Sequence, residues 1–442
     1  MKTKYLLLLL FALSLSSCEK FLEVKPRGIL IPEKMGDYEA LLNAPSMTRT
    51  FPLNLLDFTD DYLNAFETTN SSPAANGYYW RRIITVNERI SPDVWGPLYR
   101  TIYSANVIIN GIQESTEGSD VQKNSIRAEA LFVRANCYLD LLTVFAKAYN
   151  PTTASTDPGL PLITTTDVND KSPNRSSVKA TLDYIIADLK QAVESLPVVN
   201  INRYRVTKHA AYGLLSRVYL YMGDYQNAKI YTDLALQGPH NILNYNSYAT
   251  KAGVPVYDLN PEVLWQRAAF SGSVNFMLYT NDLKTYFNND DIRYVFLTVT
   301  NIRGLGRSTL PGNYSFGIGY PELYLTKAEL LARDGKSDEA IAVVNFIRKN
   351  RIRTAVYADQ TASSPADALT KVLDERRREL AFSGLRWFDM KRLDQEGRML
   401  EVKRINPTTG TVDATLAPKD SKYTFEIPTR VLGFNPDMQA NF

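Results

Sequence analysis

Two stretches of the chain carry the same pattern, in which two amphipathic helices are joined by a short glycine turn. In Thr207–Leu236, an apolar helix face runs up to Gly223-Asp224 and resumes after Tyr225. The second stretch begins near Tyr324 and turns at Asp334-Gly335. Helix pairs of this kind cannot bury their apolar faces alone, so they must stack on neighbouring elements. The pattern therefore predicts a helical scaffold and excludes a predominantly β fold.

The pairs are of the tetratricopeptide (TPR) type, with small residues at the helix crossing. Helical periodicity also marks Arg127–Ala148 and Ser177–Leu196. We therefore expect TPR-type pairs within about 127–236 and 321–350, separated by long insertions. The insertions are rich in Gly, Pro, Asn and Tyr, and the chain is predicted to be mainly α with a few short strands. Because binding concentrates on loops held by a rigid scaffold, the ligand face is expected in loops at about 70–87 and 237–319.

The N-terminus has the pattern of an export signal. Lys2 and Lys4 precede an apolar run, Tyr5–Leu13, that is too short to span a bilayer. The run leads to Leu15-Ser-Ser-Cys18, which resembles a bacterial lipobox. We expect residues 1–17 to be a signal peptide and Cys18 to be lipidated, so that residues 18–442 form one domain tethered to a membrane. The alternative is a plain secretory signal in which Cys18 is incidental.

Composition limits the chemistry. The formal charge of +3 argues against a dedicated nucleic-acid binder, and two histidines make a His-ligated zinc site or a His-based catalytic centre improbable. Cys137, in an apolar helical stretch, is expected to be a small buried side chain. The sequence contains no zinc-protease, nucleophile-elbow, P-loop or Cys-x-x-Cys motif. We predict no metal and no cofactor.

Several further segments occur in a specific order along the chain. The strongest is Glu375-Arg-Arg-Arg-Glu-Leu-Ala-Phe382 followed by Arg386-Trp-Phe-Asp-Met-Lys-Arg392. The others are Cys18-Glu-Lys-Phe-Leu22, Asp57 with Asp60-Asp61, Trp95-Gly-Pro-Leu-Tyr99 with Ala105-Asn106, Arg127–Ala135, Leu283–Phe287 with Asp291 and Arg293, Ile427-Pro428, and Asn435-Pro436 with Gln439. Together they resemble the SusD/RagB outer-membrane nutrient-binding lipoproteins of Bacteroidota.

The resemblance implies a function. Members of that family have a helical, SusD-like fold with TPR-type pairs and a loop-rich ligand face. They lie outside the outer membrane, cap a TonB-dependent (SusC-like) transporter, and pass it a nutrient, most often a glycan and sometimes a peptide. They perform no bond chemistry. For this chain the resemblance implies a surface-exposed, lipid-anchored protein that captures an oligosaccharide for its transporter, and not an enzyme.

Glycan binding needs an aromatic face flanked by polar side chains. Trp95 and Trp387 lie in the family segments and Trp265 in a strand-like run, which leaves Trp80. The alternative is that Trp80 is a buried loop aromatic. The candidate ligand-binding residues are Tyr78, Tyr79, Trp80, Arg81, Asn275, Phe276, Tyr279, Tyr314 and Phe316.

The charged segment Glu375–Arg392 is interpreted as structural, a helix that docks on the core. Asp374/Arg378 and Arg376/Glu379 have the spacing of helical ion pairs. Three arginines could instead bind phosphate, although the interleaved carboxylates would compete for them.

Two other functions compete. A periplasmic TPR scaffold would need only the helix pairs, and a secreted glycosidase would need a carboxylate pair such as Asp60-Asp61 or Asp290-Asp291. The long Tyr- and Asn-rich insertions argue against the scaffold. Nothing in the sequence fixes the carboxyl–carboxyl separation that a glycosidase needs.

Overall fold

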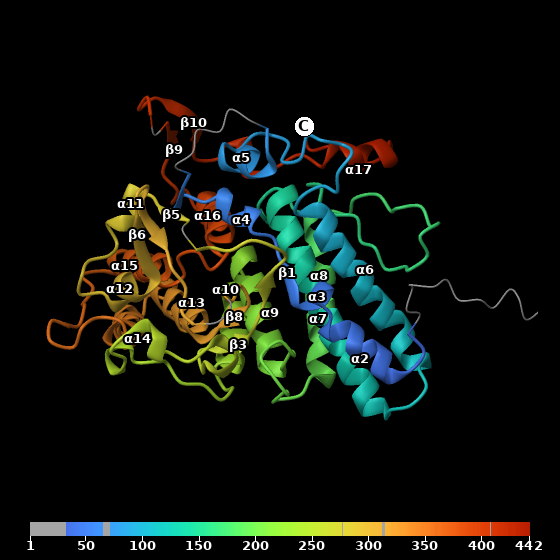
Figure 1. Cartoon of the computed structure of the whole chain (residues 1–442), viewed down its shortest axis with the longest axis horizontal. Coiled ribbons are helices and arrows are strands. Elements are labelled where there is room, and N and C mark those ends of the chain that lie inside the picture. Colours follow the sequence, from blue (N-terminus) through green and yellow to red (C-terminus); the bar gives the residue numbers. More distant parts are fainter. Residues whose placement is uncertain (1–31, 65–70, 276, 312–313, 407) are drawn as a thin grey trace, which may run out of the picture.

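The computed structural model describes residues 32–64, 71–275, 277–311, 314–406 and 408–442. The predicted signal peptide and Cys18 lie outside these residues, as does Phe276. Helices dominate the fold and the strands are short (Figure 1), so the prediction of a mainly α chain is confirmed. The helices are α2 (Met35–Asn43), α3 (Pro45–Thr48), α4 (Asn54–Asp57), α5 (Pro73–Tyr78), α6 (Trp95–Gly111), α7 (Asp120–Phe145), α8 (Val178–Ser195), α9 (Lys208–Met222), α10 (Tyr225–Ala235), α11 (Asn281–Lys284), α12 (Ile292–Leu297), α13 (Tyr320–Arg333), α14 (Ser337–Lys349), α15 (Pro365–Glu379), α16 (Arg386–Gln395) and α17 (Thr429–Phe434).

The strands form small separate sheets. Their bounds are β1 (Arg49–Phe51), β2 (Tyr62–Leu63), β3 (Val263–Trp265), β4 (Ala268–Ala269), β5 (Leu278–Tyr279), β6 (Thr298–Asn301), β7 (Gly304–Arg307), β8 (Ile318–Gly319), β9 (Val402–Ile405) and β10 (Val412–Leu416). The largest sheet is antiparallel, in the order β2-β5-β7-β6, while β9 and β10 pair as a separate antiparallel hairpin. Most of the strands come from the long insertion predicted as ligand-face loops.

The first predicted helix pair is α9 with α10, and its turn has the expected chemistry. Gly223 ends α9 at φ +70°, a conformation that costs glycine little, and the Asp224 side chain caps α10. Ser216 and Thr232 hydrogen-bond across the crossing at 2.7 Å. Helix α10 in turn packs on α13, the first helix of the second pair, so the two pairs stack on each other.

The second pair is α13 with α14, and α15 completes it as a third helix. Buried small and branched side chains of all three share one apolar cluster, which includes Ala328, Ala340 and Ala368. Helices α13 and α14 lie in the region where the second pair is expected, and α15 packs on both of them.

The core centres on α7, between α6 and α8, where Cys137 has no exposed surface.

Burial raises the pKa of the Cys137 thiol to about 12. A thiolate is the reactive form, so we expect Cys137 in the native protein from residue 19 onward to resist iodoacetamide. Mass spectrometry should show full alkylation only after unfolding in guanidinium chloride. Rapid alkylation without denaturant would contradict the buried position.

The charged segment near the C-terminus docks on the core, as predicted. On α16, Trp387 Nε1 and Lys391 Nζ donate to the carbonyl of Thr143 at 3.0 and 2.9 Å, near the end of α7. The ion pairs differ from those expected along one helix: Arg376 binds Asp389 at 2.9 Å rather than Glu379. The segment is therefore held by contacts between elements, which helical spacing does not show.

Candidate ligand-binding groove

A groove of about 620 Å³ opens between α15, α11 and the chain that enters β9. In Figure 1 the labels α11, α15 and β9 lie on the left-hand side of the molecule. The surrounding secondary structure fixes its walls: Thr280 caps α11, Ser364 caps α15, and β10 pairs along β9. The volume suits a ligand of two or more sugar rings.

Ion pairs made by two buried arginine side chains line the groove, with Asp60 and Asp61 buried and Asp282 exposed. Arg377 binds Asp61 at 2.8 Å and Asp282 at 2.7 Å, and Arg386 binds both oxygens of Asp60 at 2.7 and 2.6 Å. Burial alone would raise the pKa of Asp60, but Arg386 and Arg377 outweigh it and hold the pKa well below its ordinary value. Burial raises the pKa of Asp61 instead. Both carboxylates are thus used to position arginines.

The walls offer polar groups around an aromatic ring. Tyr286 is half-buried, with the Arg377 guanidinium 4.9 Å from its ring centre. Asn281 of α11 and Lys403 of β9 also line the groove and are exposed, and Asp374 is half-buried. Burial also raises the pKa of Asp374. An aromatic ring with neighbouring amide, ammonium and carboxylate groups can stack on a sugar and bind its hydroxyls.

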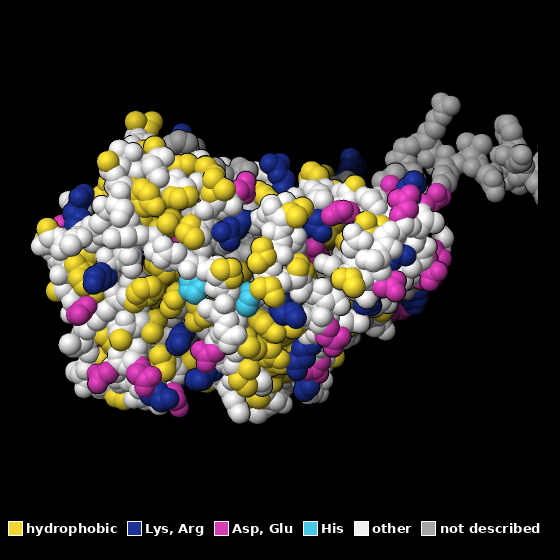
Figure 2. Space-filling model, turned by 90° about the horizontal axis from the view of Figure 1, so that it is seen from below, with side chains coloured by type: hydrophobic (Ala, Val, Ile, Leu, Met, Phe, Trp, Pro, Cys, Tyr) yellow, Lys and Arg dark blue, Asp and Glu magenta, His cyan; other side chains and the backbone are white. Residues whose placement is uncertain are grey.

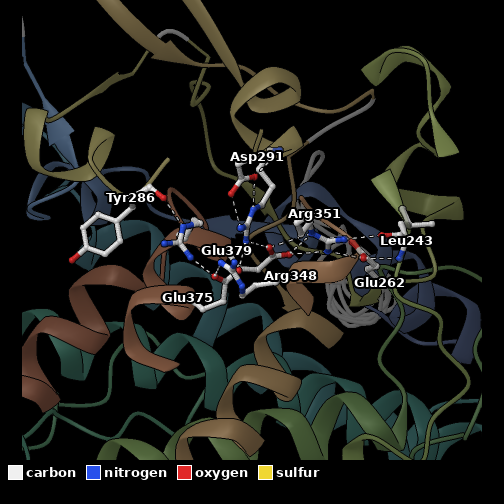
Figure 3. A network of polar contacts seen from close by, with 10 residues as sticks. Leu243, Glu262, Tyr286, Asp291, Arg348, Arg351, Glu375 and Glu379 are labelled. Carbon is white, nitrogen blue, oxygen red and sulfur yellow. Dashed lines mark hydrogen bonds and ion pairs between the residues drawn. The ribbon is translucent and has the colours of Figure 1, made fainter. Parts of the chain in front are cut away.

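Behind the groove lies a balanced network of buried ions, drawn in Figure 3. Arg293 donates to Asp291, Glu375 and Glu379, and Arg351 to Glu262 and Glu379, at 2.6–3.2 Å. Arg378 pairs with Glu375 and donates to the Tyr286 carbonyl, which links the network to the groove wall. The network therefore fixes α15 against α12 and the segment that follows α14.

The structure corrects the prediction for Trp80, whereas Tyr78 is largely buried but lines the groove and remains a prediction. Trp80 is 2% exposed and Tyr78 is 3% exposed. Their rings hold the Arg404 guanidinium, which lies 4.0 Å from the Tyr78 ring centre and 4.2 Å from that of Trp80, and Trp80 Nε1 donates to the Phe58 carbonyl at 2.8 Å. Trp80 does not line the groove, and its buried ring has no free face for a sugar. The alternative interpretation, a buried loop aromatic, holds for Trp80.

Tyr79 and Arg81 remain predictions as ligand residues. Both are half-buried, the Arg81 guanidinium lies 5.2 Å from the Tyr79 ring centre, and Arg81 Nη1 donates to Asn76 at 2.9 Å. Neither lines the groove.

The later candidates also separate into buried and accessible residues. Tyr279 is 1% exposed, and Phe316 is 4% exposed and stacks on Phe51 with ring centres 4.0 Å apart, so these two predictions are corrected. Asn275 is exposed and Tyr314 half-buried, and both remain predictions. Tyr314 lines a second, smaller cavity.

Sequence reasoning missed Tyr286, Asn281, Asp282 and Lys403. Tyr286 lies within Leu283–Phe287, which was read only as a family segment. The one local signal was the polar run Thr280-Asn-Asp282 before that segment.

The described ranges also bear on metal binding and membrane insertion. They contain no group of three or more His, Cys, Asp or Glu side chains that could hold a metal ion. Within the same ranges no helix is both long and apolar enough to cross a bilayer. Figure 2 shows the two histidines on one face among hydrophobic side chains, where His209 contacts the Leu234 carbonyl and His240 contacts Tyr324 Oη at 2.8 Å.

A helical scaffold with a groove on its side is the arrangement of a helical ligand-binding protein, and this is the class to which the fold points. Residues 264–442 match the model of the SusD family, and residues 20–220 match a related model described as starch-binding and associating with the outer membrane. The chain belongs to the SusD/RagB family.

Relatives of known name agree with this assignment. SusD-like protein P38 of Formosa agariphila is 24% identical, and the alignment covers 86% of this chain and 89% of P38. SusD-like protein P25 of the same organism is 25% identical over 60% of this chain, a match that spans only 51% of P25.

Solved structures share the fold. A SusD superfamily protein from Bacteroides vulgatus aligns with a TM-score of 0.76 at 21% identity, over 92% of this chain and 99% of that one. A SusD-like carbohydrate binding protein from the same organism aligns with a TM-score of 0.72 at 20% identity, over 92% and 97%.

Proposed function

We propose that this protein is a surface lipoprotein that captures an oligosaccharide and delivers it to a TonB-dependent outer-membrane transporter. The observation that carries the proposal is the groove of about 620 Å³, which Tyr286 lines together with amide, carboxylate and ammonium groups on a SusD-family scaffold. Family membership supports the location at the outer membrane and the partnership with a SusC-like transporter. Lipidation at Cys18 would supply the anchor, and the ligand face would point to the exterior.

A peptide ligand is the second candidate, because a groove with charges of both signs also suits a peptide.

The TPR scaffold is less well supported, since α10 packs on α13 and α15 covers α13 and α14. Those contacts occupy surfaces that a scaffold would offer to partners. The glycosidase is also less well supported, because Asp60 and Asp61 are committed to Arg377 and Arg386 and are at most 9% exposed. We propose a binding role without catalysis.

Calorimetry of the protein from Glu19 to Phe442 against soluble oligosaccharides and peptides tests the proposal. Replacement of Tyr286 by alanine removes the aromatic ring from the groove, and we expect about a tenfold loss of affinity for the bound oligosaccharide. Tyr103→Ala is the matched control, because Tyr103 is 41% exposed on α6 and does not line the groove.

The outcomes separate the candidates. Binding of a peptide but of no oligosaccharide would replace the glycan by the peptide proposal. Oligosaccharide binding that Tyr286→Ala leaves unchanged would place the site elsewhere, with Tyr79 and Asn275 as the next positions to replace.

A further inference from the structure

A second cavity, of about 130 Å³, lies apart from the groove and is lined by Arg307 of β7. Its other walls include Tyr257, Leu310, Tyr314 and Ser383. The Tyr257 and Tyr314 ring centres are 6.0 Å apart, so two aromatic rings form part of the wall. The volume is several times the roughly 30 Å³ that one water molecule occupies in the liquid.

Arg307 is a buried cation whose hydrogen bonds are incomplete. It is 4% exposed, and its two terminal nitrogens donate to the hydroxyls of Tyr279 and Tyr314 at 3.0 Å each. Its Nε is buried with no hydrogen-bond partner, and no carboxylate within the described ranges forms an ion pair with it. The rings of Tyr314 and Phe382 lie near its guanidinium, with ring centres 5.4 and 5.9 Å away, and stabilise part of the charge. A buried cation with no counterion and one unsatisfied N–H is still costly, and an anionic partner would relieve that cost.

Arg404 shows how this chain satisfies an arginine that lacks a carboxylate. It is also buried, and its three nitrogens donate to the backbone carbonyls of Asp57, Thr59, Tyr62 and Tyr78. Arg307 has no such set of carbonyls. Arg404 is therefore satisfied by the fold alone, whereas Arg307 Nε remains an unused hydrogen-bond donor.

The carboxylates that line the cavity are not counterions of Arg307, because each of them pairs with another arginine. Glu322 is bound by Arg217 through both oxygens at 2.8 and 2.7 Å. Glu262 and Glu379 are bound by Arg351, and Glu379 also by Arg293. Each carboxylate is therefore already neutralised, and Arg307 is the charge on the cavity wall that has no counterion. The hydroxyl of Ser383 is a second buried group there without a partner.

We propose that this cavity binds a compact carboxylate, with Arg307 Nε and Ser383 Oγ as donors and the two tyrosine rings against the carbon skeleton. A uronic acid residue has this combination of a carboxylate and a sugar ring. The assignment to a sugar acid rests on the proposed glycan-binding function, whereas the carboxylate site rests on Arg307 alone.

The test is calorimetric titration of the protein from residue 19 with D-glucuronate, beside D-glucose as the neutral analogue, in low-salt buffer. We expect glucuronate to bind about tenfold more tightly than glucose and to weaken with added salt. Arg307→Met should abolish the preference, and Arg353→Met, at an exposed arginine, should leave it unchanged. Equal binding of the two sugars, no binding of glucuronate, or full preference in Arg307→Met would overturn the proposal.

Three further measurements keep the test decisive. If Arg307→Met does not fold, Ser383→Ala removes one unpartnered donor, and we expect it to weaken glucuronate binding by about threefold. Acetate should compete with glucuronate if the carboxylate alone is recognised. Tyr286→Ala should not alter glucuronate binding, so failure of the oligosaccharide groove and failure of the carboxylate cavity are distinguishable.

Discussion

Replacement of Arg293 by methionine is expected to destabilise the protein by about 3–5 kcal/mol, because it leaves buried carboxylates without their cation. The Arg293 side chain is 2% exposed and binds Asp291, Glu375 and Glu379 together. A loss of this size is a large part of the total stability of a typical protein. The free energy of unfolding from urea titration, followed by tryptophan fluorescence, measures it. Arg353→Met is the control, because Arg353 is exposed, and we expect a change within about 0.5 kcal/mol.

Acid unfolding gives the same variant a second readout. Burial alone would raise the pKa of Glu379, but Arg351 and Arg293 outweigh it and lower the pKa to about 2. A carboxylate with a lowered folded-state pKa contributes stability that is present above its ordinary pKa of 4.5 and is lost as pH falls toward 2. Without Arg293 the pKa of Glu379 should rise, and the midpoint of acid unfolding should move to higher pH. An unchanged midpoint in Arg293→Met would show that the network does not hold this carboxylate ionised.

The scaffold could be predicted from sequence because its signals are local. The period of apolar residues and the turns at Gly223 and Gly335 mark the helix pairs, and each signal lies within the element that it describes. The ion pairs of α15 and α16 could not be predicted in the same way. Arg376 reaches Asp389 on the next helix, and Arg377 reaches Asp61 from 316 residues away. Spacing along one helix indicates which pairs are possible but not which partner the tertiary fold supplies.

The candidate site was harder to predict for a related reason. The local sequence around a loop tryptophan is the same whether its ring contacts a ligand or a buried arginine. The arginine that contacts Trp80 is Arg404, on the distant strand β9. Tyr286 was missed for the opposite reason, because it lies within a family segment, Leu283–Phe287, that was expected to be framework. Accessibility depends on which distant elements cover a residue, and no pattern within either stretch contains that information.

Replacement of Trp80 by alanine is therefore expected to lower stability rather than to remove a ligand contact. The ring is 2% exposed, and its loss leaves a cavity beside Arg404 and an unmatched carbonyl at Phe58, for a cost of about 3–5 kcal/mol. Trp80 also lies at φ +50°, and such strain persists only where the surrounding contacts hold it. Thermal unfolding followed by circular dichroism measures the loss.

The neighbouring residue provides the control for that experiment. Tyr79 is half-buried and stacks against Arg81, so Tyr79→Ala should cost about 1 kcal/mol or less. If Tyr79 does contact the ligand, Tyr79→Ala should weaken binding in calorimetry while the protein keeps its stability. Trp80→Ala should show the reverse, a lower unfolding temperature with ligand affinity retained in the fraction that folds. A Trp80→Ala protein of full stability that no longer binds an oligosaccharide would restore Trp80 as a ligand residue, and would require the Gly77–Arg82 segment to open on binding.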